Sequence, residues 1–172
     1  MAKRIIALCV FFCVLFCGCA AKRTCQKELC ADFQADFTAE YNGLLFGGKL
    51  LNTRQGNTNL RFTRPQTLRD LELAYKNGEV CLRRTMAVCT ADEGYLPDVS
   101  FSSVLRQILR GMADDRAQLV KADENCCVYS LQTACGSCEI KTDLSGLPKS
   151  FYLQKPKLLA QFSNASKIGE EQ

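Results

Sequence analysis

Twelve of the 172 residues are cysteine, and none is histidine. Four of the cysteines lie in the first 21 residues, which leaves eight in the remainder of the chain. Eight is an even number, and a short chain with this many cysteines is typical of an oxidising compartment. We therefore expect four disulfides. The cysteines that would form them are Cys25, Cys30, Cys81, Cys89, Cys126, Cys127, Cys135 and Cys138.

The N-terminal segment determines the expected compartment. Two basic residues precede an uncharged run over residues 5–16, and small residues follow as far as Ala21. This order is typical of a secretory signal peptide, and the run is shorter than the roughly 20 apolar residues of a membrane-spanning helix. We expect residues 1–21 to be removed, which leaves a secreted, extracellular protein without a transmembrane segment. Lys22-Arg23 is then either a processing site or a short basic terminus.

Apolar residues at helical spacing predict three helices after the signal peptide. The first covers residues 25–46 and ends at Gly47-Gly48. The second begins at Pro65, and Asn77-Gly78 either ends or kinks it. The third has Asp98 as its expected N-cap. The apolar positions of the first helix are Leu29, Phe33, Phe37 and Tyr41. Those of the second are Leu68, Leu71 and Tyr75. Those of the third are Phe101, Val104, Leu105, Ile108 and Met112.

The C-terminal part of the chain has a different character. The segment from Cys126 to Cys138 is rich in cysteine and β-prone, and beyond residue 143 the periodicity is weak. We therefore predict a mainly α fold: a small disulfide-stapled three-helix domain with a Cys-rich C-terminal segment and a loose tail. The expected boundaries are residues 22–142 for the disulfide-rich helical domain and residues 143–172 for the loosely ordered tail.

The absence of histidine narrows the possible chemistry. It excludes Ser-His-Asp and Cys-His nucleophilic sites, histidine general bases and histidine-ligated metals. Cys135 and Cys138 have the C-x-x-C spacing of thiol–disulfide oxidoreductases, so an enzyme that uses this pair is an alternative. The secretory route favours oxidised sulfur over thiolate ligands, and we expect no metal and no cofactor.

A basic segment is the strongest candidate for a binding site. From Tyr41 to Arg69 there are five basic residues and no acidic one. The four assigned to a candidate binding loop are Lys49, Arg54, Arg61 and Arg64. A loop with uncompensated positive charge between two helices suits an anionic glycan, a lipid headgroup or an acidic receptor surface. The formal net charge is +4 and falls to +2 without the two basic residues of the signal. We therefore expect no nucleic-acid partner.

Two further surface features follow from the sequence. Asn164-Ala165-Ser166 is an N-x-S sequon, and we expect glycosylation of Asn164 in an exposed tail. Carboxylates at four-residue spacing along the first predicted helix form an acidic column, which is either a surface for a basic partner or a solvated face. The column consists of Glu28, Asp32, Asp36 and Glu40.

The compartment, the cysteine count and the lack of a catalytic motif favour a binding protein over an enzyme. We predict a secreted, disulfide-rich ligand, modulator or toxin-like protein that acts on an extracellular protein or receptor. An anionic glycan is a second class of partner. The alternatives are a secreted thiol–disulfide oxidoreductase and an extracellular matrix or glycan-binding component.

Overall fold

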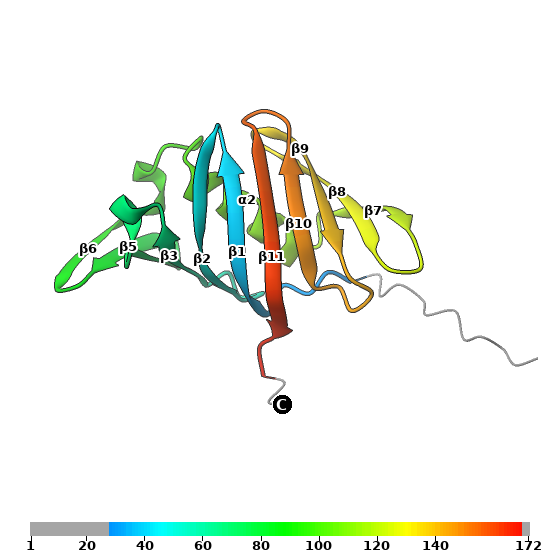
Figure 1. Ribbon diagram of the computed structural model, residues 1–172, viewed down its shortest axis with the longest axis horizontal. Helices are drawn as coiled ribbons and strands as arrows, with labels where there is room; N and C mark the ends of the chain where they lie inside the picture. Colours follow the sequence, from blue (N-terminus) through cyan, green and yellow to red (C-terminus); the bar gives the residue numbers. More distant parts are fainter. Residues whose placement is uncertain (1–27, 170–172) are drawn as a thin grey trace, which may run out of the picture.

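The computed structural model describes residues 28–169, so the predicted signal peptide and Cys25 lie outside the described residues. The described chain forms one antiparallel sheet of 11 strands, with a single α-helix against it (Figure 1). The strands before the helix are β1 (Phe33–Tyr41), β2 (Leu44–Asn52), β3 (Thr58–Arg64), β4 (Glu72–Lys76), β5 (Glu79–Arg84) and β6 (Ala87–Asp92). The helix is α2 (Phe101–Ala113). The strands after it are β7 (Gln118–Ala122), β8 (Cys127–Thr133), β9 (Gly136–Thr142), β10 (Pro148–Leu153) and β11 (Leu158–Lys167). Two short 3-10 segments, η1 (Gln66–Leu68) and η2 (Glu93–Tyr95), follow β3 and β6.

The strand order explains how a single helix connects the two halves of the sheet. The order is β6-β5-β4-β3-β2-β1-β11-β10-β9-β8-β7. The chain meanders outward from β1 to the edge strand β6, crosses the sheet through α2, and begins again at the opposite edge with β7. It then meanders back, so that β11 pairs with β1 at the centre. We call the side of the sheet that packs on α2 the helix face, and the opposite side the outer face.

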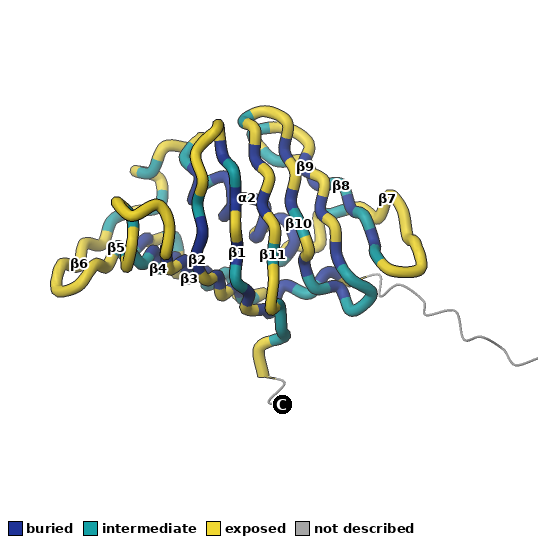
Figure 2. The backbone as a smooth tube through the Cα atoms, in the orientation of Figure 1, coloured by how far each residue is buried: buried dark blue, intermediate teal, exposed yellow. Residues whose placement is uncertain are grey.

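The first predicted helix is a strand, because its apolar spacing fits both structures. Phe33, Phe37 and Tyr41 recur every four residues, and four is also a multiple of the two-residue period of a strand. The residues between them follow that shorter period: Ala35 and Ala39 are buried as well, whereas the polar residues that alternate with them are less buried (Figure 2). The whole apolar set of β1 therefore lies on the helix face.

The prediction of a second helix is wrong, because a tight turn lies within the predicted segment. Asn77-Gly78 neither ends nor kinks a helix; it is the two-residue turn between β4 and β5. Its φ angles of 52° and 83° lie in the left-handed region, which a type I′ hairpin turn requires and which Asn and Gly tolerate best. Asn42-Gly43 forms the equivalent turn between β1 and β2, with φ angles of 49° and 83°. Each turn reverses the chain at once, so adjacent segments pair as strands.

The third predicted helix is confirmed as α2, although its N-cap is Ser100 rather than Asp98. The Ser100 hydroxyl accepts a hydrogen bond from the Ser103 backbone N–H (3.2 Å). Phe101 enters an aromatic cluster from the sheet and stacks on Phe46 with ring centroids 4.4 Å apart. The further rings of the cluster are Phe37, Tyr41 and Phe62. A stripe of buried side chains along α2 therefore closes the core on the helix face.

Arg106 ties α2 to the hairpin between β2 and β3. Its guanidinium donates hydrogen bonds to the Thr58 hydroxyl (2.7 Å) and the Gly56 carbonyl (2.6 Å), and it lies 3.4 Å from a Glu93 carboxylate oxygen. It also lies over the Tyr75 ring, 5.4 Å from the centroid. Burial lowers the pKa of Arg106, and the nearby Glu93 carboxylate opposes that shift. A buried cation with this many partners fixes the position of the helix.

The C-terminal part of the chain corrects the predicted fold class most directly. The expected loose tail contains β10 and β11, and these strands lie between β9 and β1 in the middle of the sheet. Phe151, Leu158 and Ala160 are buried there. The structure is a β-rich fold with one helix, so the prediction of a mainly α, three-helix domain is wrong.

Candidate binding face

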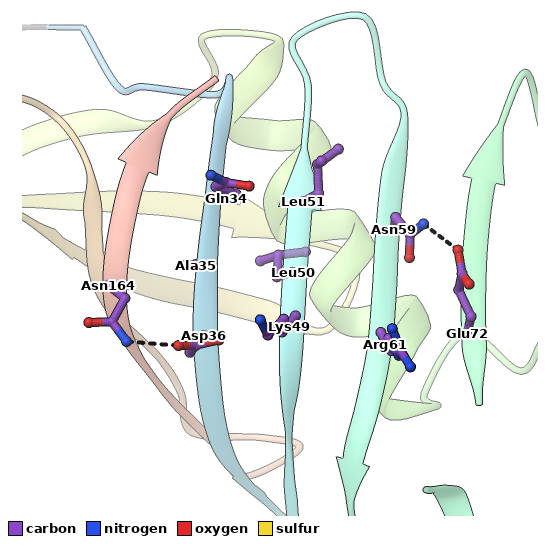
Figure 3. Close-up of a pocket in the computed structure, with 10 residues that line it drawn as sticks. All are labelled: Gln34, Ala35, Asp36, Lys49, Leu50, Leu51, Asn59, Arg61, Glu72 and Asn164. Carbon is purple, nitrogen blue, oxygen red and sulfur yellow. Dashed lines mark hydrogen bonds between the residues drawn. The ribbon is translucent and has the colours of Figure 1, made fainter. Parts of the chain in front are cut away.

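The outer face is the open side of the sheet. Side chains of α2 are buried against the helix face, whereas the outer face of β1–β4 carries a hollow of about 450 Å³ (Figure 3). Its lining comes from β11, β1, β2, β3 and β4. The hollow is lined by charged, polar and apolar side chains, among them Asp36, Lys49, Leu51, Asn59, Arg61 and Glu72.

A row of four charges crosses this hollow. Asp36 on β1 is the register partner of Lys49 on β2, Lys49 is the partner of Arg61 on β3, and Arg61 is the partner of Glu72 on β4. The two cations therefore stand directly opposite one another, with a carboxylate at each end of the hollow. Beyond the hollow, Glu72 is also the register partner of Arg83 on β5. Like charges at directly opposed positions destabilise a sheet, so their placement suggests a role other than stability.

Neighbouring amides bind the two carboxylates of the row. The Asn164 amide donates to Asp36 (2.8 Å), and the Asn59 amide donates to Glu72 (2.5 Å). Lys49 forms no ion pair within the described part of the chain, and Arg61 has only an exposed contact of 3.8 Å with Asp70. Exposed contacts of this kind contribute about 0–1 kcal/mol. The central cations are therefore available to a ligand.

Two β-bulges flank the hollow and orient its side chains. On one side, the register between β1 and β11 shifts between Gln34 and Asp36, and Asn164 adopts a φ of 53° there. This brings the Asn164 side chain onto the outer face, beside Asp36. On the other side, the register between β2 and β3 shifts at Gly47-Gly48. Bulges bend a strand and re-aim side chains, and they are frequent beside functional sites.

The structure does not bring together all four residues of the basic loop predicted from the sequence. Lys49 and Arg61 face each other in the hollow, and Arg64 lies on the same side of the sheet beside Gly47. Arg54 is elsewhere, in the turn after β2, where its guanidinium lies 3.6 Å from Asp115. The segment is not a loop between two helices as predicted: most of it forms two paired strands. The strand pairing gives three of the four residues a common face.

Asn164 lies in a strand rather than in a tail. It is an exposed residue of β11, so a glycan on its amide would lie at the hollow, where that amide now contacts Asp36. Glycosylation of Asn164 stays a prediction. Its position means that modification and ligand binding at this hollow would compete.

The cysteines do not form the expected framework of four disulfides. Thiols without a bridge are found at Cys81, Cys89, Cys126, Cys135 and Cys138. Cys127 is bonded in a disulfide, and the Cys30 thiol contacts the Asp32 carbonyl (3.3 Å). The sheet keeps two of these thiols apart. Cys81 is opposite Thr90, whereas Cys89 is opposite Leu82, so the two cysteines project from opposite faces of the β5–β6 hairpin.

The C-x-x-C pair has poor geometry for thiol exchange. Cys135 lies in the turn between β8 and β9, but Cys138 lies within β9 and is fully buried. Burial raises the pKa of Cys138 to about 12. At neutral pH its thiolate fraction is then roughly one in 10⁵, whereas catalytic cysteines have lowered pKa values. This weakens the oxidoreductase alternative.

The acidic column is dispersed by the strand geometry. Asp36 and Glu40 share the outer face of β1, but Glu28 and Asp32 precede the strand. Arg106 and Arg110 of α2 pair with Glu93, at 3.4 and 3.6 Å, and not with this column. Glu40 pairs with Lys157 (3.0 Å). The four carboxylates therefore do not form one column.

Sequence reasoning misses the neutral and acidic residues of the hollow. It places Asp36 in the acidic column and does not single out Asn59 or Glu72. Strict alternation along residues 33–41 is the signal that could place Asp36 on an outward-facing strand surface. Nothing in the sequence alone gives the register that aligns Glu72 with Arg61.

The fold is that of a curved antiparallel sheet whose single helix packs across one face. No protein-family model matches the chain. No curated protein matches it either. An uncharacterized conserved protein from Thermus thermophilus is similar in structure, with a TM-score of 0.51 and 11% identity over 81% of this chain and 80% of that chain. This similarity shows the fold alone.

Two further solved structures are similar at lower TM-scores. MucB in its complex with MucA from Pseudomonas aeruginosa has a TM-score of 0.46 and 17% identity, and the match covers 83% of this chain but only 55% of that chain. The LolA superfamily protein NE2245 from Nitrosomonas europaea has a TM-score of 0.41 and 11% identity, with 87% and 92% covered. Neither similarity is close enough to support a functional argument.

Within residues 28–169, no helix is long and apolar enough to cross a membrane. The same residues contain no cluster of three or more cysteine and acidic side chains that could bind a metal ion. The hollow on the outer face is the candidate site, because the strand register brings two cations together in it.

Proposed function

We propose that this protein is a secreted binding protein, not an enzyme, and that the hollow on its outer face recognises an acidic segment of an extracellular partner protein. The opposed pair of Lys49 and Arg61 is the observation that carries the proposal. One carboxylate placed between them would accept charge-assisted hydrogen bonds from both and remove their mutual repulsion.

The surroundings of the pair favour a protein segment over a polysulfated glycan. Asp36 and Glu72 at the two ends of the row repel a ligand of dense negative charge, so the hollow suits an extended acidic peptide, in which only every second carboxylate faces the sheet. Leu51 is 38% exposed next to the row and offers an apolar contact. The amide oxygens of Gln34 and Asn59, whose NH₂ groups donate to Ser166 and Glu72, provide acceptors for a peptide backbone.

Poly-L-glutamate is a suitable first probe, with heparin as the glycan comparison. We expect the full secreted protein to bind poly-L-glutamate with an affinity that falls as salt rises, because screening shortens to about 8 Å at 0.15 M. The double variant Lys49→Ala, Arg61→Ala should bind about tenfold more weakly and show a flatter salt dependence.

Arg54→Ala is the matched control, because it removes an exposed cation of the same segment that lies outside the hollow. Its affinity should stay within about twofold of the unmodified protein. Equal losses in the control and in the double variant would overturn the proposal. So would tight heparin binding that depends on Lys49 and Arg61 without binding of poly-L-glutamate, since that result favours the glycan alternative.

A further inference from the structure

The two edges of the sheet differ in how they are protected. Both edge strands, β6 and β7, are exposed along most of their length (Figure 2). The β7 edge carries Lys121 and a register shift between Leu119 and Lys121. A lysine and a bulge are devices by which proteins prevent an edge strand from pairing with another chain.

The β6 edge has none of these devices. Its sequence, Ala87–Asp92, contains no lysine and no proline, and its register with β5 runs without a shift. Val88 is 60% exposed on it, and Met86 in the adjoining turn is 95% exposed. The β5–β6 hairpin projects from the end of the sheet, away from α2 (Figure 1). A regular, accessible edge of this kind can accept another strand by main-chain hydrogen bonding.

The charges of the β5–β6 hairpin are separated along its length. Arg83 and Arg84 lie next to the turn, whereas Glu79 and Asp92 face each other directly at the other end. Neither arginine forms an ion pair with a described residue. Within the hairpin, one end is therefore basic and the other acidic, while on β4 Glu72 is the register partner of Arg83 and Lys76 is that of Glu79.

We infer that β6 is a self-association edge, at which a second copy of this chain pairs antiparallel with the first. A two-fold axis near Thr90 places the basic end of each hairpin beside the acidic end of its partner, twice by symmetry. A parallel arrangement would place like charges together and is disfavoured. The sheet then continues across both copies, while the outer-face hollows stay open because β6 is not part of their lining.

The dimer should be weak and dependent on concentration, because one strand edge buries less than a standard interface of about 1,600 Å². Sedimentation equilibrium of the full secreted protein at several concentrations and two salt levels measures it. We expect a monomer–dimer equilibrium that weakens as salt rises. A monomer at every concentration would overturn the inference.

Two variants locate the interface. Thr90→Lys puts a lysine on the β6 edge at an exposed position and should weaken dimerisation about tenfold or more. Val120→Lys is the matched control, because it places the same side chain on the exposed β7 edge, and it should leave the dimer unchanged. The inference is wrong if both variants behave alike.

Cross-linking tests the arrangement independently of affinity. Cys89 lies one residue from the expected axis, so a short bismaleimide should join Cys89 of one copy to Cys89 of the other. Cys89→Ser should abolish the cross-linked dimer, and Cys81→Ser should not, because Cys81 lies on the inner strand β5. A dimer linked through another cysteine would refute the β6 edge.

Discussion

Gly47 and Gly48 offer a test of the strand register, because the same substitution at these two adjacent positions should change stability by very different amounts. A Cβ added at Gly48 would lie 2.1 Å from the Arg61 carbonyl oxygen and 3.0 Å from the Phe62 Cα, where ordinary contacts begin near 3.4 Å. These are backbone atoms of β3, so no side chain can move aside. A Cβ at Gly47 would meet its nearest atom, the Phe37 carbonyl oxygen, at 3.5 Å.

Gly48→Ala must therefore push β2 and β3 apart. Overpacking costs about 1–3 kcal/mol, and each backbone group left without its hydrogen bond adds about 1–3 kcal/mol. The shift also disturbs Phe62, which packs on Phe37 and Phe101. We expect a loss of about 3–5 kcal/mol in the free energy of unfolding. Gly47→Ala should change it by less than about 1 kcal/mol, in either direction, since no left-handed φ is required there.

Denaturant unfolding followed by far-UV circular dichroism measures both variants, since the chain contains no tryptophan to serve as a fluorescence probe. The midpoint of thermal unfolding should fall by about 2–4 °C per kcal/mol for a chain of this size. If the two variants unfold within about 0.5 kcal/mol of each other, the bulged register between β2 and β3 is wrong, and so is the alignment of Lys49 with Arg61.

Two further predictions concern buried groups. Arg106→Met should lower the free energy of unfolding by about 3 kcal/mol, because it leaves Thr58 and Gly56 without their buried hydrogen-bond donor. Arg110→Met, at a half-exposed position, should change it by less than about 1 kcal/mol in the same denaturant unfolding. Equal effects of the two substitutions would contradict the role of Arg106 in holding α2 in place. The pKa of Cys138 is raised from 9.0 to about 12 in the folded protein, so its contribution to stability is complete below pH 9 and lost as the pH rises toward 12. Unfolding at a series of alkaline pH values should therefore show a fall that Cys138→Ala flattens, and an unchanged slope in that variant would show that other groups cause the fall.

The sequence indicates some elements well and others poorly, for physical reasons that can be named. The segment from Phe101 to Met112 has a 3.6-residue apolar period that no strand can satisfy, and it forms α2. In β1 the spacing of four residues fits both a helix and a strand. The alternation of Ala35 and Ala39 with polar residues identifies the segment as a strand. The two Asn-Gly dipeptides are hairpin signals that outweigh helix periodicity in their neighbourhood.

The candidate site could be predicted only in part. The run of basic residues without carboxylates points to Lys49, Arg61 and Arg64, which the strand pairing places on one face of the sheet. It cannot separate Arg54 from them, because the division depends on where the turn after β2 begins. The carboxylates at the ends of the row come from β1 and β4, and long-range strand register brings them there. The cysteine count predicts bridges, but the sheet places Cys81 and Cys89 on opposite faces.

Nuclear magnetic resonance gives the most direct test of the outer-face site. In a titration of the ¹⁵N-labelled protein with poly-L-glutamate, the backbone amides of β1–β4 around Lys49 and Arg61 should shift together, with a common saturation curve. The amides around Arg54 and along β7 should not follow that curve. Shifts confined to the turn at Arg54, or spread evenly over the basic residues of the surface, would contradict a binding site at the hollow.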